Sequence, residues 1–283
     1  MRRPLARSLV ASRRPGLFYG AAVQDYLDRV RAADGAGLER SVTNGINTYI
    51  SGLFSAGMVG TTTGTIDGVI SQAASKIKAH CIMSGVNTMS GCFAPVVGTA
   101  PTNFNFVPGD YNRKTGLGDP ANVSKYLDTG RSNNADPQDS KHLSVYTSTS
   151  LGGNNAMIGS VIRTPATSVS QITYSAAGSV TASINGATTI DVSIGNPIGF
   201  FGVARSGASS QQLRINATNT ASTIASNGNY SQNILVFARA DAGAVNQYCV
   251  ARIRAYSIGE FIDLAILRTL QDQLVAAFNA AIP

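Results

Sequence analysis

The stretch VTASINGATTIDVSI, residues 180–194, decides the fold of this 283-residue chain. Apolar and polar residues alternate on both sides of Asn185-Gly186, which is the pattern of two strands joined by a tight turn. A register that pairs Ile184 with Thr188 across a three-residue loop places the six alternating apolar side chains of the hairpin on one face. The sequence therefore predicts an antiparallel hairpin in this register, with that face in a core.

Short apolar runs alternate with turn residues from Asn87 onward, in the same manner as in the hairpin. Strands at this spacing indicate an antiparallel β-sandwich rather than alternating βαβ units. The composition agrees, because only 13% of the residues are charged and 29 are glycine. The eight predicted strands are residues 142–148, 157–162, 180–184, 188–194, 199–205, 212–217, 233–239 and 251–256.

The C-terminal residues 263–282 show the period of an amphipathic helix. An apolar stripe runs from Leu264 to Phe278, with polar residues on the opposite side. The sequence allows two N-terminal caps for this helix. One is a capping box of Ser257 with Glu260, and the other is a later start at Asp263. We expect this helix to pack on the sandwich and close it.

The N-terminal part of the chain also has helical spacing, over residues 25–33, 38–53 and 66–83. Gly45 weakens the second of these helices by about 1 kcal/mol relative to alanine. We therefore expect a helical anchoring subdomain over residues 25–84 and a β-sandwich with its closing helix over residues 85–283.

The positive charge is concentrated at the N-terminus. The net charge is +7, and five arginines precede the first acid, Asp25, so that 7 − 5 leaves +2 for the rest. A basic extended arm over residues 1–24 that docks on a neighbouring subunit or stays solvated is favoured over phosphate contact. The arm lacks aromatic residues between the arginines, and no nucleic-acid motif follows it. Nucleic acid is therefore not an expected partner. The arginines of the arm are Arg2, Arg3, Arg7, Arg13 and Arg14.

The arm is not followed by the apolar segment of an export signal, and no run of about 18 apolar residues occurs in the chain. We therefore expect a soluble, uncleaved protein that makes no membrane contact. Cys81, Cys92 and Cys249 have neither disulfide-framework nor metal spacing and are expected to be buried free thiols. His80 lies beside Cys81 without a second ligand at a suitable spacing, so no metal or other cofactor is expected.

Residues with the chemistry of common hydrolases are scarce. The chain has only two glutamates, Glu39 and Glu260, whereas glycosidases generally need a pair of carboxylates on either side of the scissile bond. The Gly-x-Ser-x-Gly nucleophile motif and the phosphate-binding loop are also absent from the sequence. We therefore expect a structural or binding protein and not an enzyme.

A polar loop over residues 129–139 is the candidate binding site. Its Asp and Asn side chains suit calcium or the hydroxyls of a sugar, but such residues near Pro and Gly also fold turns, and both interpretations stay open. The chain has no Trp, although Tyr111, Tyr126 and Tyr230 fall in turn-rich segments that would expose an aromatic ring. The candidate glycan-binding residues are Tyr111, Arg131, Asn133, Asn134 and Asp136.

Several segments resemble one known family when they are taken together. They are Ala33-Asp34-Gly35, residues 99–103, 111–117, 125–128, 131–137 and 142–146, and Tyr256-Ser257-Ile258-Gly259 before the last helix. Over about residues 25 to 282 the chain is similar to tailed-bacteriophage structural proteins that carry a concanavalin A-like (LamG-type) jelly-roll domain. Residues 58–74 look like an insertion relative to that family, and the arm lies outside the likeness.

The resemblance implies a component of the virion, in the tail, the neck or a capsid-surface appendage. Its partners would be other virion proteins, and a homo-oligomer is expected, with a trimer favoured. A carbohydrate-binding module that recognises host surface glycans is the alternative function. A glycan hydrolase that uses Asp136 and Asp139 is the least favoured of the three hypotheses.

Overall fold

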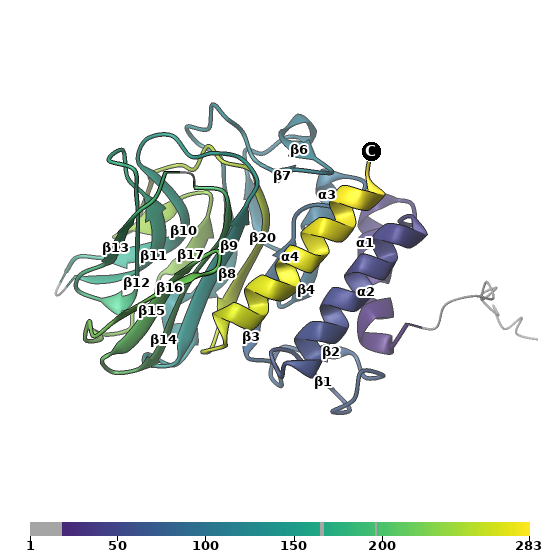
Figure 1. Cartoon of the computed structure of the whole chain (residues 1–283), viewed down its shortest axis with the longest axis horizontal. Coiled ribbons are helices and arrows are strands. Elements are labelled where there is room, and N and C mark those ends of the chain that lie inside the picture. The colour runs from purple at the N-terminus through teal and green to yellow at the C-terminus, as the bar shows by residue number, and fades with distance from the viewer. Residues whose placement is uncertain (1–18, 165–166, 196) are drawn as a thin grey trace, which may run out of the picture.

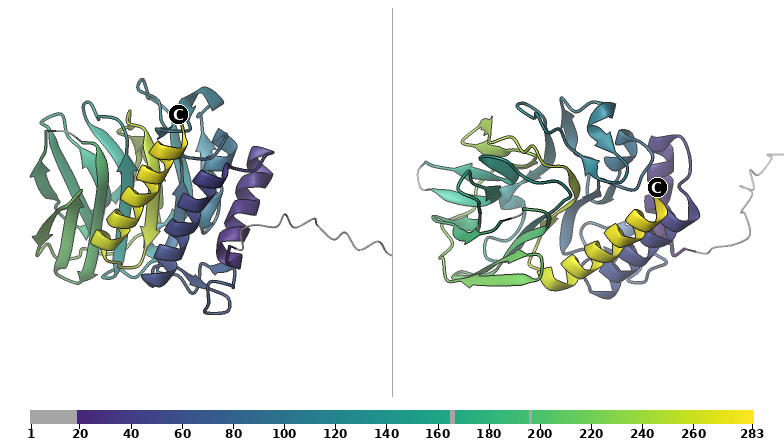
Figure 2. Two further views of the ribbon diagram at one scale, coloured as in Figure 1. Left: turned by 45° about the vertical axis from the view of Figure 1, so that its right-hand side comes forward. Right: turned by 45° about the horizontal axis from the view of Figure 1, so that its top comes forward.

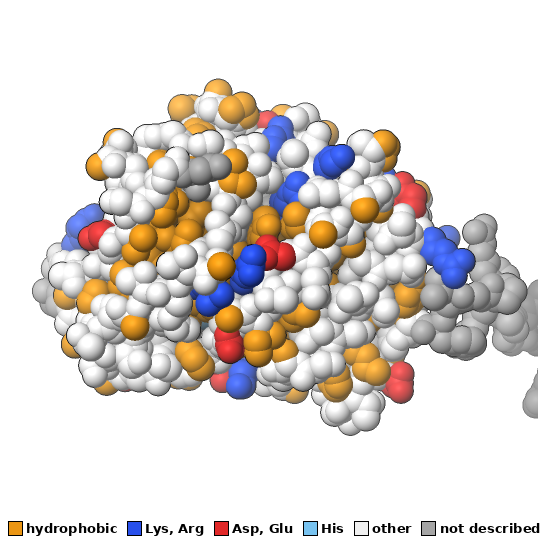
Figure 3. All heavy atoms as spheres, in the orientation of Figure 1, with side chains coloured by type: hydrophobic (Ala, Val, Ile, Leu, Met, Phe, Trp, Pro, Cys, Tyr) orange, Lys and Arg blue, Asp and Glu red, His pale blue; other side chains and the backbone are white. Residues whose placement is uncertain are grey.

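Two antiparallel sheets pack face to face in this computed structural model, which describes residues 19–164, 167–195 and 197–283 (Figure 1). The coarse prediction of a mainly β, antiparallel sandwich is confirmed. The arm arginines Arg2, Arg3, Arg7, Arg13 and Arg14 lie outside the described residues. Uncharged side chains predominate on the face drawn in Figure 3, as the low charged fraction predicts.

One sheet has no described helix over its outer face, and we call it the open sheet (Figures 1 and 2). Its strand order is β13-β12-β11-β10-β17-β8-β5, and β18 and β19 extend it through a parallel pairing of β18 with β10. The strands are β5 (Thr102–Phe104), β8 (Tyr126–Ser132), β10 (Asn155–Ile162), β11 (Ser168–Tyr174), β12 (Ser179–Gly186), β13 (Ile190–Ser193), β17 (Asn233–Val236), β18 (Arg239–Asp241) and β19 (Ala244–Asn246).

The second sheet has the order β16-β15-β14-β9-β20-β3-β4, with β6 and β7 beside β20, and we call it the covered sheet. Its strands are β3 (Ile77–Ile82), β4 (Pro95–Val97), β6 (Tyr111–Asn112), β7 (Gly116–Leu117), β9 (Lys141–Thr147), β14 (Gly199–Gly207), β15 (Ser210–Ile215), β16 (Thr218–Ser222) and β20 (Ile253–Gly259). A separate hairpin joins β1 (Gly60–Thr61) to β2 (Ile70–Ser71), and two 3-10 turns span Pro108–Asp110 and Asn133–Ala135.

The four α-helices of the described residues lie on the side of the covered sheet (Figures 1 and 2). They are α1 (Ala21–Asp34), α2 (Arg40–Ser55), α3 (Met89–Cys92) and α4 (Leu264–Ala281). Side chains of α2 and α4 reach the sheet directly, since Tyr49 is hydrogen-bonded to His80 on β3 and Asp272 to Tyr146 on β9. One apolar core runs through both sheets and these helices.

The helices predicted over residues 25–33 and 38–53 are confirmed as α1 and α2. Helix α1 ends at Gly35, whose φ of 73° is left-handed and suits glycine. Gly45 weakens α2 as an isolated helix, but a Cβ at this position would lie 2.9 Å from the Cβ of Ala277 on α4. The glycine therefore permits the close approach of the two helices.

The C-terminal helix α4 begins as one of the two predicted caps requires. The Asp263 carboxylate accepts hydrogen bonds from the backbone N–H groups of Ala265 at 2.7 Å and Ile266 at 3.4 Å. The alternative capping box of Ser257 with Glu260 is not used, because Ser257 is a residue of strand β20.

We expect Asp263→Ala to lower the free energy of unfolding by about 1 kcal/mol, because two N–H groups of the first turn lose their acceptor. Urea unfolding followed by far-ultraviolet circular dichroism measures this change. The matched variant Asp263→Asn keeps a side-chain acceptor and should retain most of the stability. Equal losses in the two variants would contradict the capping role.

The helix predicted over residues 66–83 is wrong. This segment contains β2 and then β3, which pairs with β20 and β4 inside the covered sheet. Four of the six β3 residues, from Ala79 to Ile82, are consecutively buried, between the sandwich core and the helices. A strand that is buried on both faces lacks the polar and apolar alternation of a half-exposed strand. The sandwich thus takes part of its sheet from the range 25–84 that we had expected to be a helical subdomain.

The hairpin register is confirmed. Val180 lies opposite Val192 and Ala182 opposite Ile190, which is the register that pairs Ile184 with Thr188. The alternating apolar side chains of both strands lie in the core or pack against it. The prediction of buried thiols is also confirmed, because Cys81, Cys92 and Cys249 are buried and free.

Candidate functional site

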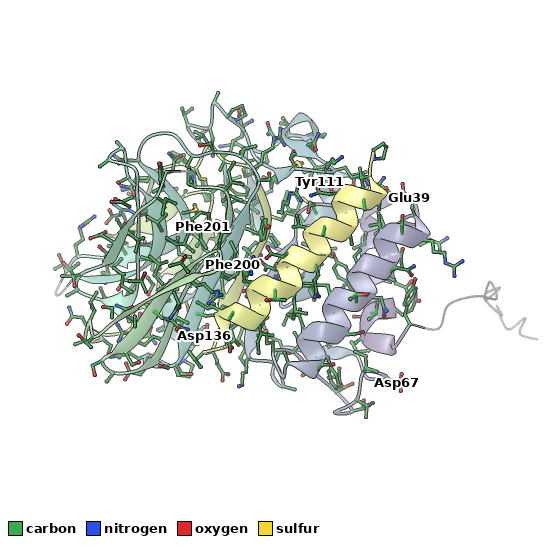
Figure 4. All side chains as sticks on the ribbon, viewed as in Figure 1. Glu39, Asp67, Tyr111, Asp136, Phe200 and Phe201 are labelled. Atoms are coloured by element: carbon green, nitrogen blue, oxygen red, sulfur yellow. The ribbon has the colours of Figure 1, made fainter. Side chains whose placement is uncertain are left out.

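The structure does not bring the predicted glycan-binding residues together. Figure 4 places Tyr111 and Asp136 near opposite ends of helix α4. The hydroxyl of Tyr111 donates to the backbone oxygen of Val86 at 2.7 Å, and burial raises its pKa. Tyr111 is therefore a structural residue and not the aromatic platform of the polar loop.

The polar loop itself folds around an internal ion pair. Arg131 donates through Nε and Nη2 to the carboxylate of Asp136 at 2.8 and 2.5 Å, and Asp136 is only 3% exposed. Asn134 is exposed, but its side-chain oxygen accepts from Ser132 at 2.8 Å. The turn-forming interpretation of this loop thus fits its geometry better than a ligand site does.

Asn133 belongs to a buried polar cluster between the two sheets. The fully buried ammonium of Lys141 on β9 donates to the backbone oxygen of Asn133, to its Oδ1 at 3.0 Å, and to the Oδ1 of Asn229 at 3.2 Å. Asn133 in turn donates to Asn185 on β12 at 2.7 Å. Desolvation lowers the pKa of Lys141 to about 8. The cluster ties the loop to both sheets and has no surface for a ligand.

A better candidate lies on the outer face of the open sheet, where a groove of about 430 Å³ crosses β10 to β13 and β18. Alternate residues of a strand face opposite sides. Ile172 on β11 points into the core, so Gln171 points into the groove. The polar residues that line this groove include Arg163, Gln171, Thr188, Thr189, Asp191 and Arg239.

One carboxylate holds the two arginines of the groove. Arg163 donates to Asp241 through Nε at 2.8 Å and Nη2 at 2.7 Å, and Arg239 donates to the same carboxylate at 2.8 Å. The hydrogen bond from Arg163 is the main cause of a lowered Asp241 pKa, and it raises the pKa of Arg163. The aspartate therefore stays ionised at neutral pH and fixes both guanidinium groups in place.

Arg239 also fixes the amide of Gln171. Its Nη1 donates to the Gln171 side-chain oxygen at 3.1 Å, and because a guanidinium has only donors, the amide oxygen must face it. The Nε2 of Gln171 makes no hydrogen bond within the described part of the chain, so its N–H groups are available to donate to a ligand in the groove. On β13, two strands from β11, the exposed carboxylate of Asp191 accepts from Thr189 at 3.3 Å. The groove thus holds hydrogen-bond donors in fixed positions together with hydrogen-bond acceptors. A ligand with many hydroxyl groups needs both.

Gly159 keeps Gln171 in this position. A Cβ at Gly159 would lie 2.5 Å from the Cβ of Gln171 on the neighbouring strand. Any side chain there would push Gln171 away from the sheet. The glycine is thus part of the architecture of the groove.

Sequence reasoning missed the residues of this groove. Gln171 lies on β11, which has only two aliphatic residues in seven and so gives a weak period-two signal. Arg163 and Asp241 are distant in the chain and form no motif. Val169 lines the groove and Ile172 lies in the core, so these two aliphatic residues share no face and give no period-two signal.

In residues 19–164, 167–195 and 197–283, no group of three or more His, Cys, Asp or Glu side chains is placed to hold a metal ion. Both ring nitrogens of His80, beside Cys81, make hydrogen bonds, one with the Tyr49 hydroxyl and one with the backbone oxygen of Tyr256. None of the described helices has the length and apolar character needed to cross a membrane.

The chain matches no protein-family model and no curated protein. Among solved structures it is similar to a mutant of Trypanosoma rangeli sialidase displaying trans-sialidase activity, and to Trypanosoma rangeli sialidase in complex with sialic acid. Each has 10% identity and a TM-score of 0.48 over 82% of this chain and 39% of that chain. The K499G mutant of NanB sialidase from Streptococcus pneumoniae has 12% identity and a TM-score of 0.35, over 46% of this chain and 23% of that one.

These matches correct the expectation that the protein is not an enzyme, because the solved structures named above are sialidases. The exclusion of an enzymatic activity, made from the scarcity of glutamates, is withdrawn. The chain covers only 39% of the Trypanosoma rangeli chains, and at 10% identity with TM-scores below 0.5 no sialidase activity is transferred to it.

Proposed function

We propose that the protein binds saccharide through the outer face of the open sheet, and that it does so as a structural protein of a tailed-bacteriophage particle. The observation that carries the binding proposal is the groove on that face, in which Asp241 and Arg239 fix the donors of Arg163 and Gln171. The virion role rests on the resemblance of the sequence. Location in the virion and a homo-oligomer, with a trimer favoured, are parts of this proposal.

We further propose that the sandwich is a concanavalin A-like jelly roll. Its support is the strand order of the covered sheet, in which β9 lies between β14 and β20, and β20 lies beside β3. Neighbours so distant in the chain require long crossing connections between the sheets, as jelly rolls have. The segments that resemble the phage family include those that form β9 and the end of β20.

The two sides of the molecule support an anchoring role for the N-terminal region. The described chain begins at Tyr19 beside α1, on the side of the covered sheet, and the open sheet lies on the other side (Figures 1 and 2). Attachment through the helical side leaves the groove accessible. The arm arginines are proposed to contact other virion proteins.

We expect Arg163→Ala to weaken saccharide binding about tenfold, because a charge-assisted hydrogen bond contributes about 1.5–3 kcal/mol. A glycan array with neutral and acidic bacterial surface saccharides identifies the ligand, and isothermal titration calorimetry measures the change. Arg31→Ala, on the exposed side of α1, is the matched control and should bind like the wild type. An array without any binding at millimolar ligand would refute the proposal.

The location is tested separately, by mass spectrometry and immunogold labelling of purified phage particles. The protein should be present in stoichiometric amounts and be labelled at one structure of the particle. Its absence from purified particles would refute the virion role and leave the binding proposal standing.

A further inference from the structure

An aromatic cluster lies at the edge of the open sheet. The rings of Phe104 on β5 and Tyr126 on β8 stack with centroids 4.4 Å apart and planes 6° apart, and Tyr248 lies 6.4 Å from Tyr126. Phe104 is 37% exposed, and Val107 and Val123 nearby in the chain are also exposed. Exposed aromatic side chains in such a cluster commonly mark a binding surface.

This cluster faces the same side as the groove. Leu127 on β8 points into the core, so its neighbours Tyr126 and Asp128 point outward. Phe104 lies directly opposite Tyr126 in the register of β5 with β8. The stacked rings therefore belong to the outer face of the open sheet.

A row of paired residues connects the cluster to the groove. Asp128 lies opposite Leu235, Leu235 opposite Gly159, and Gly159 opposite Gln171. Three strand spacings of about 4.8 Å separate Asp128 on β8 from Gln171 on β11, which is about 14 Å. The stacked rings lie farther from Gln171, because Tyr126 is two residues along β8 from Asp128 and Phe104 is on the next strand outward. A single pyranose ring is too short to touch both.

The two regions have complementary chemistry for one class of ligand. Aromatic faces present apolar surface to the C–H side of a sugar ring, while Gln171 and Arg163 donate to its hydroxyls. We infer that Phe104, Tyr126 and Tyr248 form a second subsite, and that the ligand is an oligosaccharide chain lying across the open sheet. This inference rests on the proposed saccharide binding.

We test the inference by titrating the full chain with hexaoses of glucose and of N-acetylglucosamine, with the hexaose of the best array ligand, and with the matching monosaccharides. Phe104→Ala should weaken hexaose binding about tenfold and leave monosaccharide binding unchanged. Arg163→Ala should weaken both. Phe104→Tyr keeps the ring and should bind like the wild type, and Val69→Ala, at a residue 42% exposed, is the control for lost apolar surface.

The outcomes separate the two proposals. Unchanged hexaose affinity in Phe104→Ala, together with weaker binding in Arg163→Ala, would overturn the aromatic subsite and leave the groove in place. Unchanged affinity in both variants, or no binding at all, would overturn both proposals. A change of oligomeric state in Phe104→Ala, measured by analytical ultracentrifugation, would assign the cluster to a contact between subunits and also overturn the inference.

Discussion

Lys141→Met is expected to lower the free energy of unfolding by about 3 kcal/mol, the larger part of which comes from the two oxygens of Asn133 that are left without a donor. The ammonium of Lys141 is fully buried and supplies hydrogen bonds to three oxygens of Asn133 and Asn229. Methionine fills most of the volume but donates nothing. Relief from burying a charge offsets part of the loss, since desolvation already lowers the pKa of Lys141 to about 8.

The loss should spread through the cluster, because its hydrogen bonds share the same side chains. Asn133 donates to both Asn185 and Asn229, and Asn229 donates to the backbone oxygen of Asp136. A network of this kind is stable only when each member is satisfied. The loop over residues 129–139 should therefore become more accessible to proteolysis in the variant.

Urea unfolding at pH 7, combined with limited proteolysis, measures both effects. Lys76→Met is the matched control, because Lys76 is exposed, and its stability should change by less than about 0.5 kcal/mol. A loss below about 1 kcal/mol in Lys141→Met would mean that water satisfies the two oxygens of Asn133 and that the cluster contributes little.

Stability is also expected to fall steeply between pH 6.5 and pH 4, by about 2 kcal/mol from each of two histidines by pH 5. His80 and His142 are fully buried, and desolvation lowers the pKa of each to about 4. Above pH 6.5 neither the folded nor the unfolded state binds these protons. As the pH falls from 6.5 to 4 the unfolded state binds them and the folded state does not, so stability is lost.

The hydrogen bonds explain why the folded state resists protonation. Nδ1 of His80 faces the backbone oxygen of Tyr256, and Nδ1 of His142 faces that of Glu260, so each Nδ1 must carry the proton. Nε2 then accepts from the hydroxyl of Tyr49 in one case and Ser257 in the other. In each neutral ring both nitrogens are hydrogen-bonded. If a second proton were added, no solvent would stabilise the positive charge, because the ring is buried.

Urea unfolding at pH 7.5 and pH 5 tests this expectation in the wild type, in His80→Gln, in His142→Gln and in the double variant. The chain has only these two histidines, so the double variant retains none. Each substitution should lower stability at pH 7.5 and reduce the difference between the two pH values by about 2 kcal/mol. An equal loss on acidification in the wild type and the double variant would contradict the assignment.

The candidate site shows how far sequence reasoning reaches. Residues 129–139 have the polar composition of a binding loop, yet the side chains of Asn133 and Asp136 make hydrogen bonds within the protein. Composition alone does not distinguish a polar side chain that meets solvent from one that meets its neighbours. The turn-rich sequence around Tyr126 predicts an exposed ring, and the ring is half-buried. No local pattern predicts its contact with Phe104, because β5 and β8 are distant in the chain.

The sequence by itself determined the period-two hairpin at residues 180–194 and its register, because the apolar side chains of both strands reach one core only when Ile184 faces Thr188. It also determined α4 and offered Asp263 as its cap, since both depend on residues within a few positions of one another.

Only the tertiary structure decided that β3 is a strand, because burial on both faces removes the local period. The groove likewise exists only after β10, β11 and β18 are paired, when Arg163 and Arg239 meet at Asp241. Interactions between distant parts of the chain are fixed by packing and not by spacing, and the proposed binding face is made of them.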